Sequence, residues 1–141
     1  MAKNNFNELS LALLRAVLGF MFMYHGYLKL FVPGAFNATI GFFTAIGLPL
    51  PLYSALLASL AEFVGGILLI LGLLTRYASL VLIFEMLVAF FKVHLKQGYI
   101  ISQNVYGYEY IVLILTTLVV ILINGPGKLS VGKMFKNKHL H

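Results

Sequence analysis

The stretch AEFVGGILLILGLLTR, Ala61–Arg76, places one carboxylate, Glu62, ahead of thirteen uncharged residues that end at Arg76. It belongs to a segment, 52–74, that is long enough to cross a bilayer, which takes about 20 apolar residues. An acid inside such a segment is costly, so Glu62 should face a partner or a wet cavity. Gly66 lies four residues later on the same helical face. This face indicates either a structural ion pair that holds a helix bundle together or a ligand site.

The composition indicates an integral membrane protein of one domain. Hydrophobic residues make up 61% of the 141 residues and charged residues only 10%, outside the usual ranges of soluble domains. The absence of Cys excludes disulfide exchange, thiolate zinc sites and iron–sulfur ligation by the chain itself. The net charge of +6 is concentrated in the C-terminal tail, where it sets membrane orientation and attracts anionic lipid, and nucleic acid is not an expected partner.

The sequence predicts an all-α fold, a four-transmembrane-helix bundle with a short interfacial helix between the first two spans. The predicted spans are about 9–31, 52–74, 77–93 and 108–123. The interfacial helix should cover Phe36–Ile46, and a tight turn at Thr75-Arg76 should join spans two and three. The motif NGPG stops the last span, and a basic tail, 128–141, follows. The first span carries three basic residues and lacks a clear cleavage site, so it should remain uncleaved.

Lysine and arginine divide unequally between the two sides of the predicted bundle. With four spans both termini share a side, and that side holds most of the basic residues. The positive-inside rule therefore predicts that both termini are cytoplasmic. The basic residues on that side are Lys3, Arg76, Lys128, Lys133, Lys136 and Lys138, with Arg15 close by, against Lys29, Lys92 and Lys96 on the other.

Helical rise places ionisable groups from all four spans at one depth. If Arg15 and Arg76 mark the cytoplasmic boundary, ~1.5 Å per residue puts Lys29 and Glu62 each ~21 Å above it. The groups at or near this level are Lys29, Glu62, Glu109, His25, Glu85, Lys92 and His94. They form either a set of paired charges that fixes helix register or a polar pocket, and their number favours the pocket.

Two details of this zone are predicted separately. Lys29 and Glu62 lie at matching depth on adjacent spans, so we expect a direct or water-bridged contact between them. Glu85 and His94 are nine residues apart and point to opposite faces of one helix, so they can share a site only if that helix ends or bends near Lys92.

Other chemistries fit the sequence less well. His25 and His94 could be axial haem ligands, but a lone His is more often a hydrogen-bonded structural residue. The Glu-x-x-His pairs of di-iron bundles are absent, which weighs against a carboxylate metal site. No Walker motif, dinucleotide fingerprint or nucleophile motif occurs.

Several motifs together resemble the DoxX family over most of the chain, from Leu13 to Ser130. They are LLRAVLGFMFMYHGYLKLF (13–31), FFTAIGLPLP (42–51), AEFVGGILLILGLLTR (61–76), GYEYIVLI (107–114) and NGPGKLS (124–130). The resemblance implies a prokaryotic four-helix protein of the cell (inner) membrane. The family's polar positions fall on Arg15, His25, Gly26, Lys29, Glu62, Gly65, Gly66, Arg76 and Glu109. Family members often carry an Asp where this chain has Gly132, which puts a role for a tail carboxylate in doubt.

Family members are linked to thiosulfate:quinone oxidation and to quinone stress. The resemblance therefore implies the membrane subunit of a quinone-linked oxidoreductase, with an intramembrane pocket for a quinone or a small sulfur compound. Glu62 and Glu109 would move protons as the catalytic carboxylates. The candidates for substrate binding are Arg15, His25, Lys29, Arg76, Glu85, His94 and Asn104.

The expected environment and partners follow from the same hypothesis. The chain should lie in a lipid bilayer, hold no covalent cofactor and no metal, and take a quinone or another small molecule as its ligand. A soluble redox partner and a homo-oligomer are both compatible with the sequence. The alternatives to an oxidoreductase subunit are a non-enzymatic binder or carrier of a small molecule, and a membrane scaffold for soluble redox partners.

Overall fold

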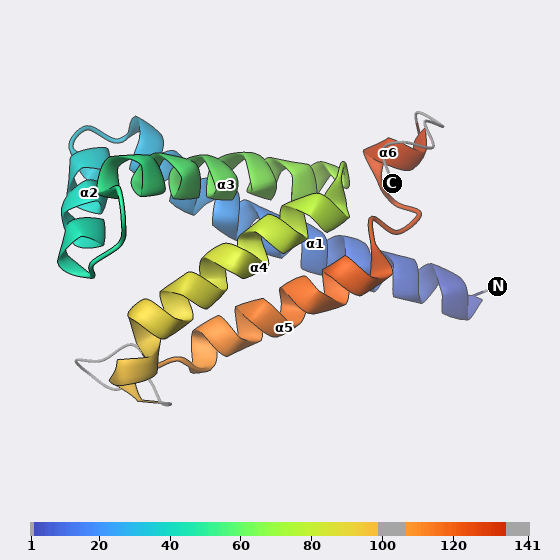
Figure 1. Cartoon of the computed structure of the whole chain (residues 1–141). Coiled ribbons are helices and arrows are strands. Elements are labelled where there is room, and N and C mark those ends of the chain that lie inside the picture. The colour runs from blue at the N-terminus through green and yellow to red at the C-terminus, as the bar shows by residue number, and fades with distance from the viewer. Residues whose placement is uncertain (1, 99–106, 135–141) are drawn as a thin grey trace.

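The computed structural model describes residues 2–98 and 107–134, and the regular structure in these two ranges is entirely helical. The long helices run alternately up and down, so the two ends of the described chain lie at one end of the bundle (Figure 1). They are α1 (Ala2–Phe31), α3 (Pro51–Leu71), α4 (Thr75–Lys92) and α5 (Glu109–Asn124). The all-α prediction is confirmed for this part of the chain.

Three shorter helices complete the described structure. The helix α2 (Ala35–Ala45) and the 3-10 helix η1 (His94–Gln97) lie at the end of the bundle opposite the termini (Figure 1). The helix α6 (Val131–Met134) follows the loop after α5. A helix between the first two spans was predicted over Phe36–Ile46, and α2 confirms it to within one residue.

Among the described residues, three helices are long and apolar enough to cross a membrane: Asn7–Phe31, Pro51–Leu71 and Thr75–Lys96. The helix α5 is also apolar, but it is shorter, at 16 residues. Large hydrophobic side chains cover the outside of the bundle, and Val17, Phe84 and Ile123 are each about 70% exposed. An apolar exterior of this kind suits hydrocarbon and not water, so the chain is a multi-pass membrane protein.

The first helix begins at Ala2, and the membrane segment within it, Asn7–Phe31, agrees with the predicted span of about 9–31 to within two residues. One predicted boundary is wrong. The turn between α3 and α4 is Gly72–Leu74, whereas the sequence placed it at Thr75-Arg76. Gly72 and Leu74 have left-handed φ angles of 70° and 44°. Their neighbour Leu73 donates its N–H to the Leu68 carbonyl, which is the Schellman arrangement that ends helices at glycine.

The helices α1 and α3 cross with their backbones in contact. A Cβ atom added to Gly66 would overlap the backbone of Met23 on α1. A Cβ added to Gly26 would overlap the backbone of Phe63 on α3 in the same way. Small residues allow this close approach in membrane helices, where packing replaces the hydrophobic effect as the force between helices. These two contacts fix the register of α1 against α3.

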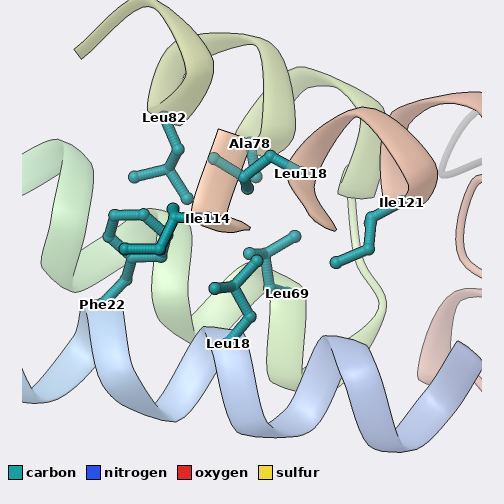
Figure 2. Packing of buried hydrophobic residues seen from close by; sticks show 8 residues of the cluster. All are labelled: Leu18, Phe22, Leu69, Ala78, Leu82, Ile114, Leu118 and Ile121. Carbon is teal, nitrogen blue, oxygen red and sulfur yellow. The ribbon is translucent and has the colours of Figure 1, made fainter. Parts of the chain in front are cut away.

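The hydrophobic core receives side chains from every long helix (Figure 2). Leu82 of α4 and Leu118 and Ile121 of α5 are completely buried, and Phe22 of α1 is 2% exposed. The core cluster consists of Leu18, Phe22, Leu69, Ala78, Leu82, Ile114, Leu118 and Ile121. This cluster packs the four long helices against one another.

Candidate functional site

An ion pair joins α1 to α3 beside their crossing. The Lys29 Nζ and the Glu62 Oε2 are 2.6 Å apart, and the Glu62 side chain is 7% exposed. Gly26 of α1 lies against the backbone of Phe63 of α3. Lys29 follows Gly26 by one helical turn and Glu62 precedes Phe63, so this contact brings the ammonium close to the carboxylate. The predicted contact between these two spans is confirmed.

Glu85 brings a second carboxylate to this pair from α4. It lies close enough to Glu62 and Lys29 for electrostatic interaction with both. Its Oε2 is buried and has no hydrogen-bond partner among the described residues. One cation therefore faces two carboxylates, and the group needs a proton, or a donor from a ligand, to balance its charge.

A cavity of about 870 Å³ opens beside these three residues. Ligand pockets in proteins usually measure about 300–1,000 Å³, so its size suits a small organic molecule. The helices α2, α3 and α4 contribute most of its wall, and the larger part of that wall is apolar. Among the described residues, the ionisable ones that line it are Lys29, Glu62, Glu85 and His94.

The outer wall of the cavity comes from α2 and the loop that follows it. Figure 1 shows α2 beside the start of α3, at the end of the bundle that α4 reaches with its last turns. Phe42, Phe43 and Ile46 line the cavity from this side. The Lys92 ammonium donates to the Gly47 carbonyl at 3.4 Å and so connects α4 with the loop after α2. Sequence reasoning treated α2 as a surface helix and missed this wall, although the paired phenylalanines were visible in the sequence.

His94 reaches the cavity because α4 ends where the prediction required. The α-helix stops at Lys92, and His94 begins η1, which allows His94 and Glu85 to line one cavity. The His94 Nδ1 lies 3.2 Å from the Ala89 carbonyl oxygen. A carbonyl only accepts hydrogen bonds, so Nδ1 carries the hydrogen, and in the neutral ring Nε2 is left as an acceptor.

Arg15 and Arg76 lie at the opposite end of the bundle and not at this cavity. The Arg15 side chain is 3% exposed, and its guanidinium donates to the carbonyls of Pro126 and Leu129, the latter at 2.6 Å. Arg76 donates to the Ile123 carbonyl at 3.3 Å. The two predicted substrate-binding arginines therefore hold the end of α5 and the loop after it. The level of the two arginines along the bundle could be estimated from the helical rise, but the position of that loop could not be predicted from the sequence.

Two other predicted site residues, His25 and Glu109, do not line the cavity. His25 is on an exposed face of α1. Glu109 begins α5 and does not line the cavity, although its depth was predicted to match that of Glu62. Asn104 lies outside the described residues. Within the described ranges, no group of three or more His, Asp or Glu residues is arranged to hold a metal ion.

Comparison with known proteins identifies the family. The sequence profile of DoxX matches residues 10–95, which is more than half of the chain. The chain belongs to the DoxX family. The matched region of this DoxX protein contains all four ionisable residues of the cavity, Lys29, Glu62, Glu85 and His94, and it ends before α5.

Relatives match the DoxX chain over nearly its whole length. An uncharacterized protein of Haemophilus influenzae is 35% identical over 91% of this chain and 92% of its own. The protein named "Putative oxidoreductase CatD" of Bacillus subtilis is 30% identical over 93% of this chain and 91% of its own. The uncharacterized membrane protein Rv3486 of Mycobacterium tuberculosis is 28% identical over 92% of this chain and 83% of its own. No solved structure matches the chain significantly.

Proposed function

We propose that this DoxX protein binds a lipid-soluble small molecule of the quinone class in the cavity between α2 and α4. In this proposal it acts as the membrane subunit of a quinone-linked redox system. The observation that carries the proposal is a largely apolar cavity of about 870 Å³ that is lined by Lys29, Glu62 and Glu85. A quinone has the matching chemistry, because its body is largely apolar and its ring carbonyl oxygens can accept a hydrogen bond. The name of the Bacillus subtilis relative supports a redox role.

The proposed placement is a single domain in the cell membrane with α5 as its fourth span. At ~1.5 Å per residue α5 is ~24 Å long, somewhat less than the ~30 Å of hydrocarbon in a typical bilayer. It packs along α4 and returns the chain to the end where α1 begins (Figure 1). The excess of Lys and Arg at that end supports cytoplasmic termini and a cavity in the outer half of the membrane.

Each polar residue of the cavity has a proposed role. The Lys29 ammonium donates to a carbonyl oxygen of the ligand, and Glu62 holds the ammonium in place. Glu85 exchanges a proton with the ligand, since its carboxyl group lines the cavity and its buried Oε2 makes no hydrogen bond among the described residues. Glu109, the other predicted catalytic carboxylate, is separated from the cavity and has no role in this step.

Reduction of a quinone takes two electrons as well as two protons, and the cavity residues supply only protons. Side chains of these types do not carry electron pairs, and cofactors normally do that work. A soluble partner that holds a cofactor is therefore part of the proposal.

A non-enzymatic binder or carrier is the second candidate. The helix α2 contains no buried residue, so a single exposed helix forms the cavity wall on its side. Such a wall would suit the passage of a lipid-soluble ligand between the cavity and the bilayer. The two candidates share the site and differ only in electron transfer.

The test is mass spectrometry of small molecules extracted with the purified protein. We expect a quinone to accompany the wild type and to be lost from Glu85→Gln and Lys29→Met. The matched control is Glu109→Gln, which changes a carboxylate that does not line the cavity and should retain the ligand. Equal retention in all variants, or no binding of added quinone by the wild type, would contradict the proposal.

A further inference from the structure

A second hollow, of about 540 Å³, lies at the end of the bundle that holds the termini. This groove is formed by the start of α1, the start of α4, the end of α5 and the region around α6. In Figure 1 these segments lie at the end of the bundle that holds the termini. Arg76 and Lys133 contribute cations to its lining, and Asn7, Ser10 and Asn124 contribute neutral polar groups. This groove is separate from the cavity between α2 and α4 and has no part in the proposed redox function.

The charged groups of the groove leave donors free for an anion. A guanidinium has five N–H donors, and the bond from Arg76 to the Ile123 carbonyl uses one of them. The Lys133 side chain is exposed. Glu8 is the acidic residue in the lining, and its Oε2 accepts the backbone N–H of Lys128. Among the described residues of the lining, two cations stand against one carboxylate, so this part of the groove has a net positive charge.

An apolar surface continues from this polar rim. Leu11 and Leu14 of α1 and Val120 of α5 line the same groove, and Leu14 and Val120 are both exposed. The helix α1 packs mainly on α3, whereas α5 packs mainly on α4. The seam between α1 and α5 is therefore less closely packed. Cations beside an apolar seam suit an amphiphile that has an anionic head and hydrocarbon chains.

We propose that Arg76 and Lys133 bind a phosphate group in this groove, supplied by the headgroup of an anionic phospholipid or by free phosphate. Guanidinium matches phosphate oxygens in a two-point geometry, and Lys adds a point charge. The apolar seam favours the lipid source. Basic side chains near an anionic membrane surface each strengthen attachment by about five-fold, so removal of both should weaken binding by about 25-fold.

The test is native mass spectrometry of the delipidated full-length protein, titrated with phosphatidylglycerol, phosphatidylcholine or inorganic phosphate. We expect phosphatidylglycerol to bind the wild type more tightly than phosphatidylcholine does. The double variant Arg76→Gln with Lys133→Gln should lose this preference. The matched control is Lys96→Gln, an exposed lysine in the short helix η1 at the opposite end, and it should keep the preference.

Two further variants make the result decisive. If the double variant does not fold, Lys133→Gln alone should weaken binding about five-fold relative to Lys96→Gln. Glu8→Gln keeps an oxygen for the Lys128 N–H, removes the negative charge, and should tighten binding. Inorganic phosphate that competes with the lipid would show a free-phosphate site, and failure to compete would show a lipid site. Equal binding of both lipids by the wild type, or equal losses in Lys133→Gln and Lys96→Gln, would overturn the proposal.

Discussion

The charge balance at Lys29, Glu62 and Glu85 predicts that the two halves of the ion pair are not equivalent. Glu62→Gln leaves Lys29 with Glu85 as a second carboxylate close by. Lys29→Met leaves two neighbouring carboxylates with no cation between them. The lysine change should therefore destabilise the protein more than the glutamate change, although each removes one partner of the same 2.6 Å contact.

The magnitudes follow from burial. Removing one partner of a buried ion pair typically costs ~3–5 kcal/mol of unfolding free energy. The Glu62 side chain is 7% exposed and Lys29 is 26% exposed, so the lower part of that range, ~3 kcal/mol, is expected for Lys29→Met. For Glu62→Gln we expect ~1–2 kcal/mol, since Glu85 takes over part of the pairing.

The assay is a double-mutant cycle on protein purified in detergent, with unfolding followed by circular dichroism. The double variant Lys29→Met with Glu62→Gln leaves one carboxylate that can hold its proton, so it should be more stable than Lys29→Met alone. The coupling energy between the two positions should be ~1–3 kcal/mol, as for residues in direct contact. Additive losses would show that the two residues do not interact, and a larger loss for Glu62→Gln than for Lys29→Met would refute the role given to Glu85.

Four other outcomes are expected. Gly66→Ala should lower stability in thermal unfolding by ~1–3 kcal/mol because the new methyl group meets the α1 backbone. The control Gly41→Ala, at a position on α2 that faces open space, should be neutral or slightly stabilising. Arg15→Gln should lower stability by ~3 kcal/mol and speed limited proteolysis after α5, because two loop carbonyls lose a charged donor. An unchanged rate of cleavage would show that Arg15 does not hold this loop. Cytoplasm-only reporters fused to either terminus should both be active, and a silent C-terminal fusion on a well-expressed protein would mean an odd number of spans. The purified protein should be colourless and should not by itself pass electrons from thiosulfate to a soluble quinone. It should become active when a co-purified partner is added. Turnover by the isolated chain that is abolished by Glu62→Gln would exclude the need for a partner.

The membrane class, the helices and one contact of the site could be predicted from the sequence. Apolar runs of about 20 residues and their stop signals locate helices because chain length and bilayer thickness leave few alternatives. The Lys29–Glu62 contact could be predicted because a buried charge requires a partner, and the rise along each helix placed these two at one depth. The sequence also showed that His94 and Glu85 can line one cavity only if α4 ends or bends near Lys92.

Only the tertiary structure decided which polar residues share a cavity. Depth along a helix can be counted from the sequence, but the rotation of each helix and its lateral neighbours depend on packing. Backbone contacts at Gly26 and Gly66 set α1 against α3 and bring Lys29 to Glu62. Glu109 has a similar counted depth and still lies away from the cavity.

Irregular segments account for the remaining differences between prediction and structure. The loop after α5 has no periodicity, so the sequence did not show that Arg15 is buried against the Pro126 carbonyl. The short helix α2 contributes no buried residue to the core, so the sequence pattern did not predict that it forms a wall of the cavity. The sequence by itself determined the kind of protein, the helices and the need to pair its buried charges, because these depend on local pattern and solvation. The site was decided by contacts between distant segments, whose geometry no local pattern records.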